Sequence, residues 1–143
     1  MEDYYMNLAI KEAKKAFKLG EMPVGAVIVY KNKVIATGYN KKEKKKNSLM
    51  HAEIIAINKA CKKLKDWRLN NCIMYVTMEP CNMCMGAIIE SRIEKLICGV
   101  RNYKSKNINE LILKKEKIKV VYEIRKNDIE KIINMFFLKI RNR

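Results

Sequence analysis

The feature that most constrains this chain is a pair of short motifs that could share one metal ion although a long stretch of sequence separates them. His51-Ala52-Glu53 holds the only histidine, and Pro80-Cys81-Asn82-Met83-Cys84 holds two of the five cysteines. One imidazole and two thiolates are a common ligand set for zinc, and they leave the fourth tetrahedral position open for water. A fold that uses this set has to bring His51, Cys81 and Cys84 to one point.

Each motif also has a plainer explanation. A lone His51 could be a helix-terminal or core histidine, and Glu53 could be an ordinary glutamate of a first helical turn. Cys81 and Cys84 could instead be a redox pair of the thioredoxin type, which would make the protein a thiol-disulfide oxidoreductase. However, Pro80 precedes the first cysteine and is suited to starting a helix, which places both thiols on one helical face. Together the motifs favour an open, hydrolytic zinc site in which Glu53 moves the protons of the water.

The three remaining cysteines bear on whether this site is open or closed. Cys61 ends a helical run and Cys98 lies within an apolar stretch, so both are expected to be small buried residues, whereas Cys72, at the start of a strand, is harder to place. A fourth thiolate from any of them would close the site, and the protein would then be an RNA-binding module with a structural zinc. No secretory segment is evident, so we expect a reducing compartment and no disulfides.

Length and charge narrow the class of protein further. The 143 residues fit a single domain, 1–143, and no apolar run approaches membrane-spanning length, so we expect a cytoplasmic protein without a membrane segment. The formal net charge of +16 would concentrate polyanions at the surface, which favours nucleic acid as the partner. A biased genome could also produce so many lysines. The tract 41–46 is the most suggestive part of this charge, with a solvated loop as its plainer explanation.

Hydrophobic periodicity predicts alternating helices and strands. We expect helices at 3–19, 51–63, 81–91 and from Asn127 or Asp128 to about Lys139, and strands at 24–30, 33–39, 72–78, 95–100 and 118–124. The first two strands would form a hairpin at Lys31-Asn32, residues 40–50 a loop, and the stretch through Lys117 a charged, irregular segment. The order of the central elements predicts parallel pairing with crossover helices, hence an α/β fold: a three-layer α/β/α sandwich around a mixed five-stranded sheet. Two helices that begin at the same sheet edge would point their N-termini at the metal.

The chain resembles the bacterial tRNA-specific adenosine deaminases over nearly its whole length. The similarity runs through residues 21–27, 38–40, 51–53, 75–84, 86–93 and 136–137. His-Ala-Glu with Pro-Cys-x-x-Cys is shared with guanine and cytosine deaminases, so this motif implies only the superfamily and its cytidine deaminase-like fold. The flanking Glu21-x-Pro-Val-Gly25, Ser91-Arg-Ile93 and Phe136-Phe137 favour the tRNA family, with a free-base guanine or cytosine deaminase as the alternative.

This resemblance implies an activity and a set of partners. The reaction would be hydrolytic deamination of adenosine to inosine at the wobble position of a tRNA anticodon, most simply that of an arginine tRNA, with one zinc ion per subunit. His51, Cys81 and Cys84 would hold the zinc, and Glu53 would take a proton from water and protonate N1 of the adenine. The partner would be an anticodon stem-loop, whose unstacked bases can be splayed into a pocket. Family members are typically homodimers, and the apolar surface for this would come from Met83, Met85, Ile88 and Ile89, which core packing explains about as well.

The resemblance also implies substrate contacts. Asn40 and the backbone at Ala52 would hold the extruded base, and Val24 would line its pocket. Contacts to the rest of the RNA are expected from Asn102, Lys104, Lys106, Phe136, Lys139 and Arg141.

Three departures from the family pattern concern these contacts. The family usually has aspartate at position 102, where it would accept a hydrogen bond from an RNA 2′-hydroxyl, whereas Asn102 can both donate and accept. Discrimination against single-stranded DNA is therefore expected to be relaxed. Residues 104–110 replace a small, Gly-rich stretch, and in segment 47–50 the bulky Met50 directly precedes His51. These changes bear on RNA contacts and not on the zinc chemistry.

Overall fold

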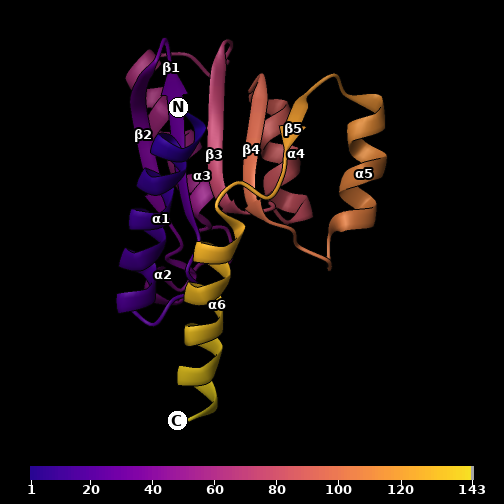
Figure 1. The fold of residues 1–143 in the computed structure, drawn as a ribbon. Helices are drawn as coiled ribbons and strands as arrows, with labels where there is room; N and C mark the ends of the chain where they lie inside the picture. The colour runs from indigo at the N-terminus through magenta and orange to yellow at the C-terminus, as the bar shows by residue number, and fades with distance from the viewer. Residues whose placement is uncertain (143) are drawn as a thin grey trace.

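The computed structural model describes residues 1–142, apart from the side chain of Lys106. The elements in chain order are α1 (Glu2–Lys18), β1 (Gly25–Tyr30), β2 (Lys33–Tyr39), α2 (Lys42–Lys45), α3 (Ala52–Leu64), β3 (Cys72–Met78), α4 (Asn82–Glu90), β4 (Lys95–Val100), α5 (Lys106–Lys115), β5 (Lys119–Val121) and α6 (Lys126–Arg141). The five strands form one sheet in the order β2-β1-β3-β4-β5, with helices on both of its faces (Figure 1). The predicted three-layer sandwich is confirmed.

The sheet is mixed, and its parallel part determines where the site lies. β1 pairs antiparallel with both β2 and β3, whereas β3, β4 and β5 run parallel to one another. The β1–β2 hairpin turns at Lys31 and Asn32, which both have positive φ, as a tight two-residue hairpin turn requires. Because parallel strands end at the same edge, the segments that follow β3 and β4 lie next to each other, and the Glu79 N–H donates to the Val100 carbonyl at 2.8 Å.

Two apolar layers hold the helices against the sheet. Along β1, Ala26 and Ile28 face the layer formed with α3 and α4, and Val27 and Val29 face the layer formed with α1 and α6. Strands buried on both faces read as continuous apolar runs, which explains why β1, β3 and β4 were visible in the sequence. α6 packs at its start on β4 and then extends past the end of the sheet (Figure 1).

Three segments differ from the sequence prediction. The stretch expected to be irregular contains α5, whose one buried side chain between residues 107 and 115 is the polar Asn109, while its apolar Ile108 and Leu111 are largely exposed. β5 is shorter than the predicted strand 118–124, because Glu123 and Arg125 have positive φ and turn the chain out of the sheet. In the loop predicted at 40–50, the structure adds the short helix α2. Across residues 1–142, none of the helices combines the length and apolar character needed to cross a bilayer.

Gly38 allows β2 to approach α3 closely, next to the start of the helix that follows His51. A Cβ atom at Gly38 would lie 2.5 Å from the Ala52 carbonyl oxygen and 3.0 Å from the Ala56 nitrogen. Both atoms belong to backbone, so a side chain can be accommodated only if the helix moves. The glycine therefore fixes the distance between the sheet and the helix that positions His51.

Substitution of Gly38 by alanine is expected to lower the free energy of unfolding by about 1–3 kcal/mol, because the added methyl overpacks this contact. Gly86→Ala is the matched control: nothing lies within 4 Å of a Cβ there, and alanine in a helix interior should add about 0.5–1 kcal/mol. Urea unfolding of the two variants measures both changes. Equal stability of Gly38→Ala and the wild type would show that α3 shifts without cost.

Candidate metal centre and its pocket

His51, Cys81 and Cys84 meet at the sheet edge where β3 and β4 end. We call these three residues the metal cluster, or simply the cluster. Their ligand atoms all lie within 4.8 Å of one another. His51 Nδ1 is 3.7 Å from Cys81 Sγ and 3.5 Å from Cys84 Sγ. His51 is the residue before α3 and Cys81 the residue before α4, so both helices begin at this point, as predicted. One imidazole nitrogen and two sulfurs at this spacing suit a tetrahedral zinc ion with one position left for water.

The other cysteines lie away from the cluster. Among the described residues, the His, Cys, Asp and Glu groups that could hold a metal are these three alone. Cys72 and Cys98 are buried in the core, whereas Cys61 is only partly buried, contrary to the expectation, and its thiol donates to the Trp67 carbonyl at 3.8 Å. All five cysteines are free thiols. This arrangement favours the open site over the closed structural zinc.

Glu53 lies beside the cluster without being part of it. It belongs to the first turn of α3, is 3% exposed and lies beside the Cys84 thiol. Burial raises the pKa of the Glu53 carboxyl to about 7. A carboxyl group that gains and loses its proton near neutral pH is suited to general acid–base catalysis.

The two thiols have very different pKa values when no metal is present. A hydrogen bond from Cys84 lowers the pKa of Cys81 to about 4, with a further contribution from His51. The same contact and burial raise the pKa of the Cys84 thiol well above its ordinary value. The cluster thus already favours one thiolate, and a divalent cation would stabilise the second as well. The donor set therefore fits zinc.

A cavity of about 220 Å³ opens beside the cluster. Its lining residues are Met22, Val24, Asn40, Lys42, His51, Ala52, Glu53, Met78, Glu79, Cys81 and Asn102. The structure thus brings together at the cluster four of the residues predicted to contact substrate: Val24, Asn40, Ala52 and Asn102. An apolar wall with a few polar groups is typical of a small-molecule pocket.

The other predicted contact residues lie outside this cavity. Lys104, Lys139 and Arg141 are exposed. Phe136 is buried against Phe17, with ring centroids 6.3 Å apart, so its neighbour Phe137 is the ring that solvent reaches. The side chain of Lys106 lies outside the described part of the structure.

Lys42 is a lining residue that the sequence analysis assigned only to a charged tract. Its backbone N–H donates to Asn40 Oδ1 at 3.4 Å. The buried carboxylate of Glu21 accepts the backbone N–H groups of Glu43 and Lys44 and so fixes the first turn of α2. Lys42 is therefore held at the cavity, whereas Lys44, Lys45 and Lys46 are exposed to solvent.

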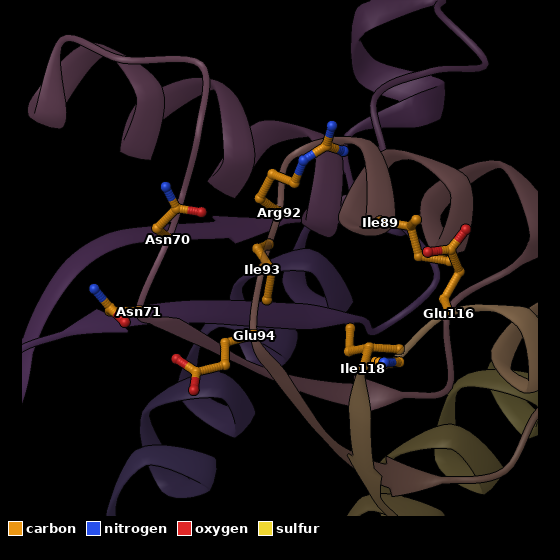
Figure 2. A pocket seen from close by; sticks show the side chains of 9 residues that line it. Asn70, Asn71, Ile89, Arg92, Ile93, Glu94, Glu116 and Ile118 are labelled. Atoms are coloured by element: carbon orange, nitrogen blue, oxygen red, sulfur yellow. The ribbon is translucent and has the colours of Figure 1, made fainter.

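A larger cavity, of about 710 Å³, lies at the opposite edge of the sheet, where β3, β4 and β5 begin. Figure 2 shows side chains such as Asn70, Arg92, Glu94 and Ile118 around it. Its lining includes neither histidine nor cysteine, and it is remote from the cluster. The larger cavity is therefore not the one that contains the candidate metal ligands.

Comparison with known proteins gives consistent matches over almost the whole chain. The MafB19-like deaminase family matches residues 1–141. The tRNA-specific adenosine deaminase of Buchnera aphidicola subsp. Schizaphis graminum is 41% identical over 142 residues, covering 95% of this chain and 93% of that protein. That of Bacillus subtilis is 38% identical over 148 residues, covering 99% and 92%. A solved structure from studies of A-to-I editing by tRNA:A34 deaminases superimposes with a TM-score of 0.85 at 32% identity, covering 90% of this chain and 98% of the other.

Proposed function

The chain belongs to the tRNA-specific adenosine deaminase family, and on this premise we propose that it converts the wobble adenosine of a tRNA anticodon to inosine. The observation that carries the proposal is the His51, Cys81 and Cys84 cluster, with the buried Glu53 beside it, at one cavity. Water is consumed and ammonia is released, so the exocyclic C–N bond of the adenine breaks and a C–O bond forms. The proposed tRNA is an arginine tRNA, and the proposed compartment is the cytoplasm.

His51, Cys81 and Cys84 would hold one zinc ion per subunit. When bound, zinc supplies a water activated for attack on C6 of the adenine. Glu53 moves the protons: its carboxylate takes one from the attacking water, delivers it to N1, and assists the departure of ammonia. Its burial beside Cys84 excludes bulk water, which would otherwise compete for these protons.

Three groups of the cavity would hold the base. The Asn40 side chain and the backbone at Ala52 would bind its polar edge, and Val24 would pack against its face. Asn40 is oriented for this role because its Nδ2 donates to the Met22 carbonyl at 3.4 Å and its Oδ1 accepts from Lys42. A cavity at the protein surface can receive only a base that has left its stack, as in an anticodon loop.

Outside the cavity, the exposed Lys104, Lys139 and Arg141 would contact the RNA backbone, within the field of a chain whose formal net charge is +16. A role for Phe136 would act through packing, since its ring is buried. A homodimer is part of the proposal. Met85 and Ile88 are fully buried in the core and Ile89 is partly buried against it, which leaves Met83 as the exposed residue of the predicted interface.

The test is inosine formation by the zinc-loaded protein on an arginine-tRNA anticodon stem-loop, with guanine, cytosine and adenine as free bases in parallel. Inosine at the wobble position, without ammonia from the free bases, is the expected result. Ammonia from guanine or cytosine alone would make the protein a nucleobase deaminase. No product from any substrate would overturn the enzymatic proposal.

A second activity, on single-stranded DNA, is favoured by the conformation of Asn102. Its Oδ1 accepts a hydrogen bond from the Lys104 N–H at 3.2 Å, which leaves the Nδ2 donor for a substrate. An aspartate there would present only acceptors and would favour a 2′-hydroxyl donor, whereas an amide donor does not require one. We infer that the residue present here relaxes discrimination at the ribose.

Substitution of Asn102 by aspartate is accordingly expected to lower the ratio of DNA to RNA turnover by about tenfold, the worth of a hydrogen bond of about 1.4 kcal/mol. DNA and RNA hairpins of the same loop sequence measure the ratio. Asn107→Asp is the matched control, because it makes the same change at an exposed position of α5. Absence of DNA product with the wild type would contradict the inference.

A further inference from the structure

The carboxylate of Glu79 is a buried charge next to the metal cluster, and the mechanism above does not use it. Its side chain is 0% exposed. One oxygen accepts from Arg101 Nε at 2.9 Å and from the Asn102 backbone N–H at 3.0 Å, and the other accepts from Asn109 Nδ2 at 3.1 Å. A buried carboxylate is tolerated only when donors of this kind satisfy it. Glu79 therefore joins three segments: the end of β3, the chain after β4, and α5.

A second set of contacts fixes α5 against the segment that carries Cys81. The completely buried Asn109 donates to the Pro80 carbonyl at 2.9 Å, and the Ser105 hydroxyl donates to the same carbonyl at 3.3 Å. Pro80 directly precedes Cys81. We call Glu79, Arg101, Ser105 and Asn109 the Glu79 network.

Arg101 links the Glu79 network to β5. Its guanidinium lies 3.7 Å from the ring centroid of Tyr122, just after that strand, and it also reaches Glu110 of α5 at 3.4 Å. Its partner Glu79 is fully shielded, whereas Glu110 is about half exposed. Most of the constraint on Arg101 therefore comes from Glu79, since exposed ion pairs contribute little.

Among the residues that the structure describes, Asn102 alone both contacts Glu79 and offers a free polar atom at the cavity. Glu79 binds its backbone N–H, and the Lys104 N–H binds its side-chain Oδ1. These two contacts determine where the residue lies and leave Nδ2 as the group that can meet a substrate. Glu79 also lines the cavity, but both of its carboxylate oxygens are occupied by donors of the protein, so it has no free atom for a substrate.

We propose that Glu79 is a positioning residue for substrate recognition, which holds Asn102 at the cavity through the Glu79 network. The inference rests on the proposed function, because the ligand in question is the anticodon stem-loop. It assigns α5 a role as well, since the Asn109 side chain occupies the second oxygen of Glu79 and keeps the first available for Asn102.

The first test replaces Glu79 with glutamine, which has the same shape. Its amide NH2 group would face Arg101, Asn102 or Asn109, which are themselves hydrogen-bond donors, so at least one of the present hydrogen bonds would be lost. The KM and the Kd for the stem-loop are expected to rise about tenfold, and kcat to change by less than about threefold. Glu110→Gln is the matched control: it removes the same charge from another partner of Arg101 but leaves Asn102 untouched. Equal effects of the two substitutions would reduce Glu79 to a general electrostatic role.

A double-mutant cycle with Asn102→Ala then separates positioning from mere structural support. If Glu79 acts through the Asn102 side chain, Glu79→Gln should raise Kd by less than about twofold in the Asn102→Ala background. Multiplied effects of the two substitutions would overturn the proposal.

Misfolding of a variant and loss of turnover both have to be distinguished from loss of binding. If Glu79→Gln does not fold, Asn109→Ala replaces it in the cycle and is expected to raise Kd about threefold in the wild-type background and not in Asn102→Ala. Because Kd is measured without turnover, a protein that binds the stem-loop but makes no inosine would refute the proposed function and leave the cycle readable. A wild-type Kd that does not depend on Asn102 would refute the positioning role.

Discussion

Glu53→Gln is expected to lower the rate of inosine formation by about a thousandfold while zinc content stays at the wild-type level. Glutamine has the same size and fits the same buried position, but it cannot take up or release a proton, and general acid–base groups contribute about 10²–10⁴-fold. Zinc should remain because the metal cluster consists of His51, Cys81 and Cys84 without Glu53. Single-turnover kinetics and elemental analysis of the same preparation measure both quantities.

The control for this variant is Glu90→Gln, which removes the same charge from an exposed position at the end of α4. It should leave turnover unchanged. Near-normal turnover by Glu53→Gln would remove Glu53 from the proton-transfer role. Loss of zinc in that variant would instead show that the carboxylate holds the cluster together through its contact with Cys84.

The fold was predictable where burial leaves a simple pattern. β1, β3 and β4 are apolar on both faces, and the hairpin has asparagine at its turn, so the strand positions and the β1–β2 hairpin follow from the sequence. α5 was missed because its apolar Ile108, Leu111 and Ile112, although at helical spacing, stand among many charged and polar residues. The one residue that it buries between 107 and 115 is the polar Asn109, which gives no apolar signal. The end of β5 was missed because positive φ at Glu123 depends on the tertiary path and not on a glycine.

The metal cluster was predictable for a different reason. Its three ligands carry rare chemistry in two compact motifs, so spacing alone indicated that His51, Cys81 and Cys84 would meet. Lys42 and Glu79 were missed as lining residues because their positions depend on distant partners: Glu21 holds α2, and Arg101 and Asn109 hold Glu79. One sequence without its tertiary contacts does not show that such a glutamate is buried.

Replacing Cys84 with alanine should remove zinc and bring turnover below detection. Cys84 is buried and supplies one of three protein ligands, and loss of outer-shell partners alone lowers metal affinity by about 10–100-fold, so loss of a ligand should exceed a hundredfold. Glu53 would remain present but would have no activated water to deprotonate. Zinc titration with a chelating dye and inosine formation measure the two losses.

Cys98→Ala separates loss of a ligand from loss of packing, because it removes an equally buried thiol from β4 outside the metal cluster. Zinc content and turnover should both stay at the wild-type level in this variant, at a small cost in stability for the cavity left behind. Full zinc in Cys84→Ala would disprove the ligand assignment. Loss of zinc from Cys98→Ala would mean that a fourth thiolate closes the site, and a structural zinc would then replace the open, catalytic one.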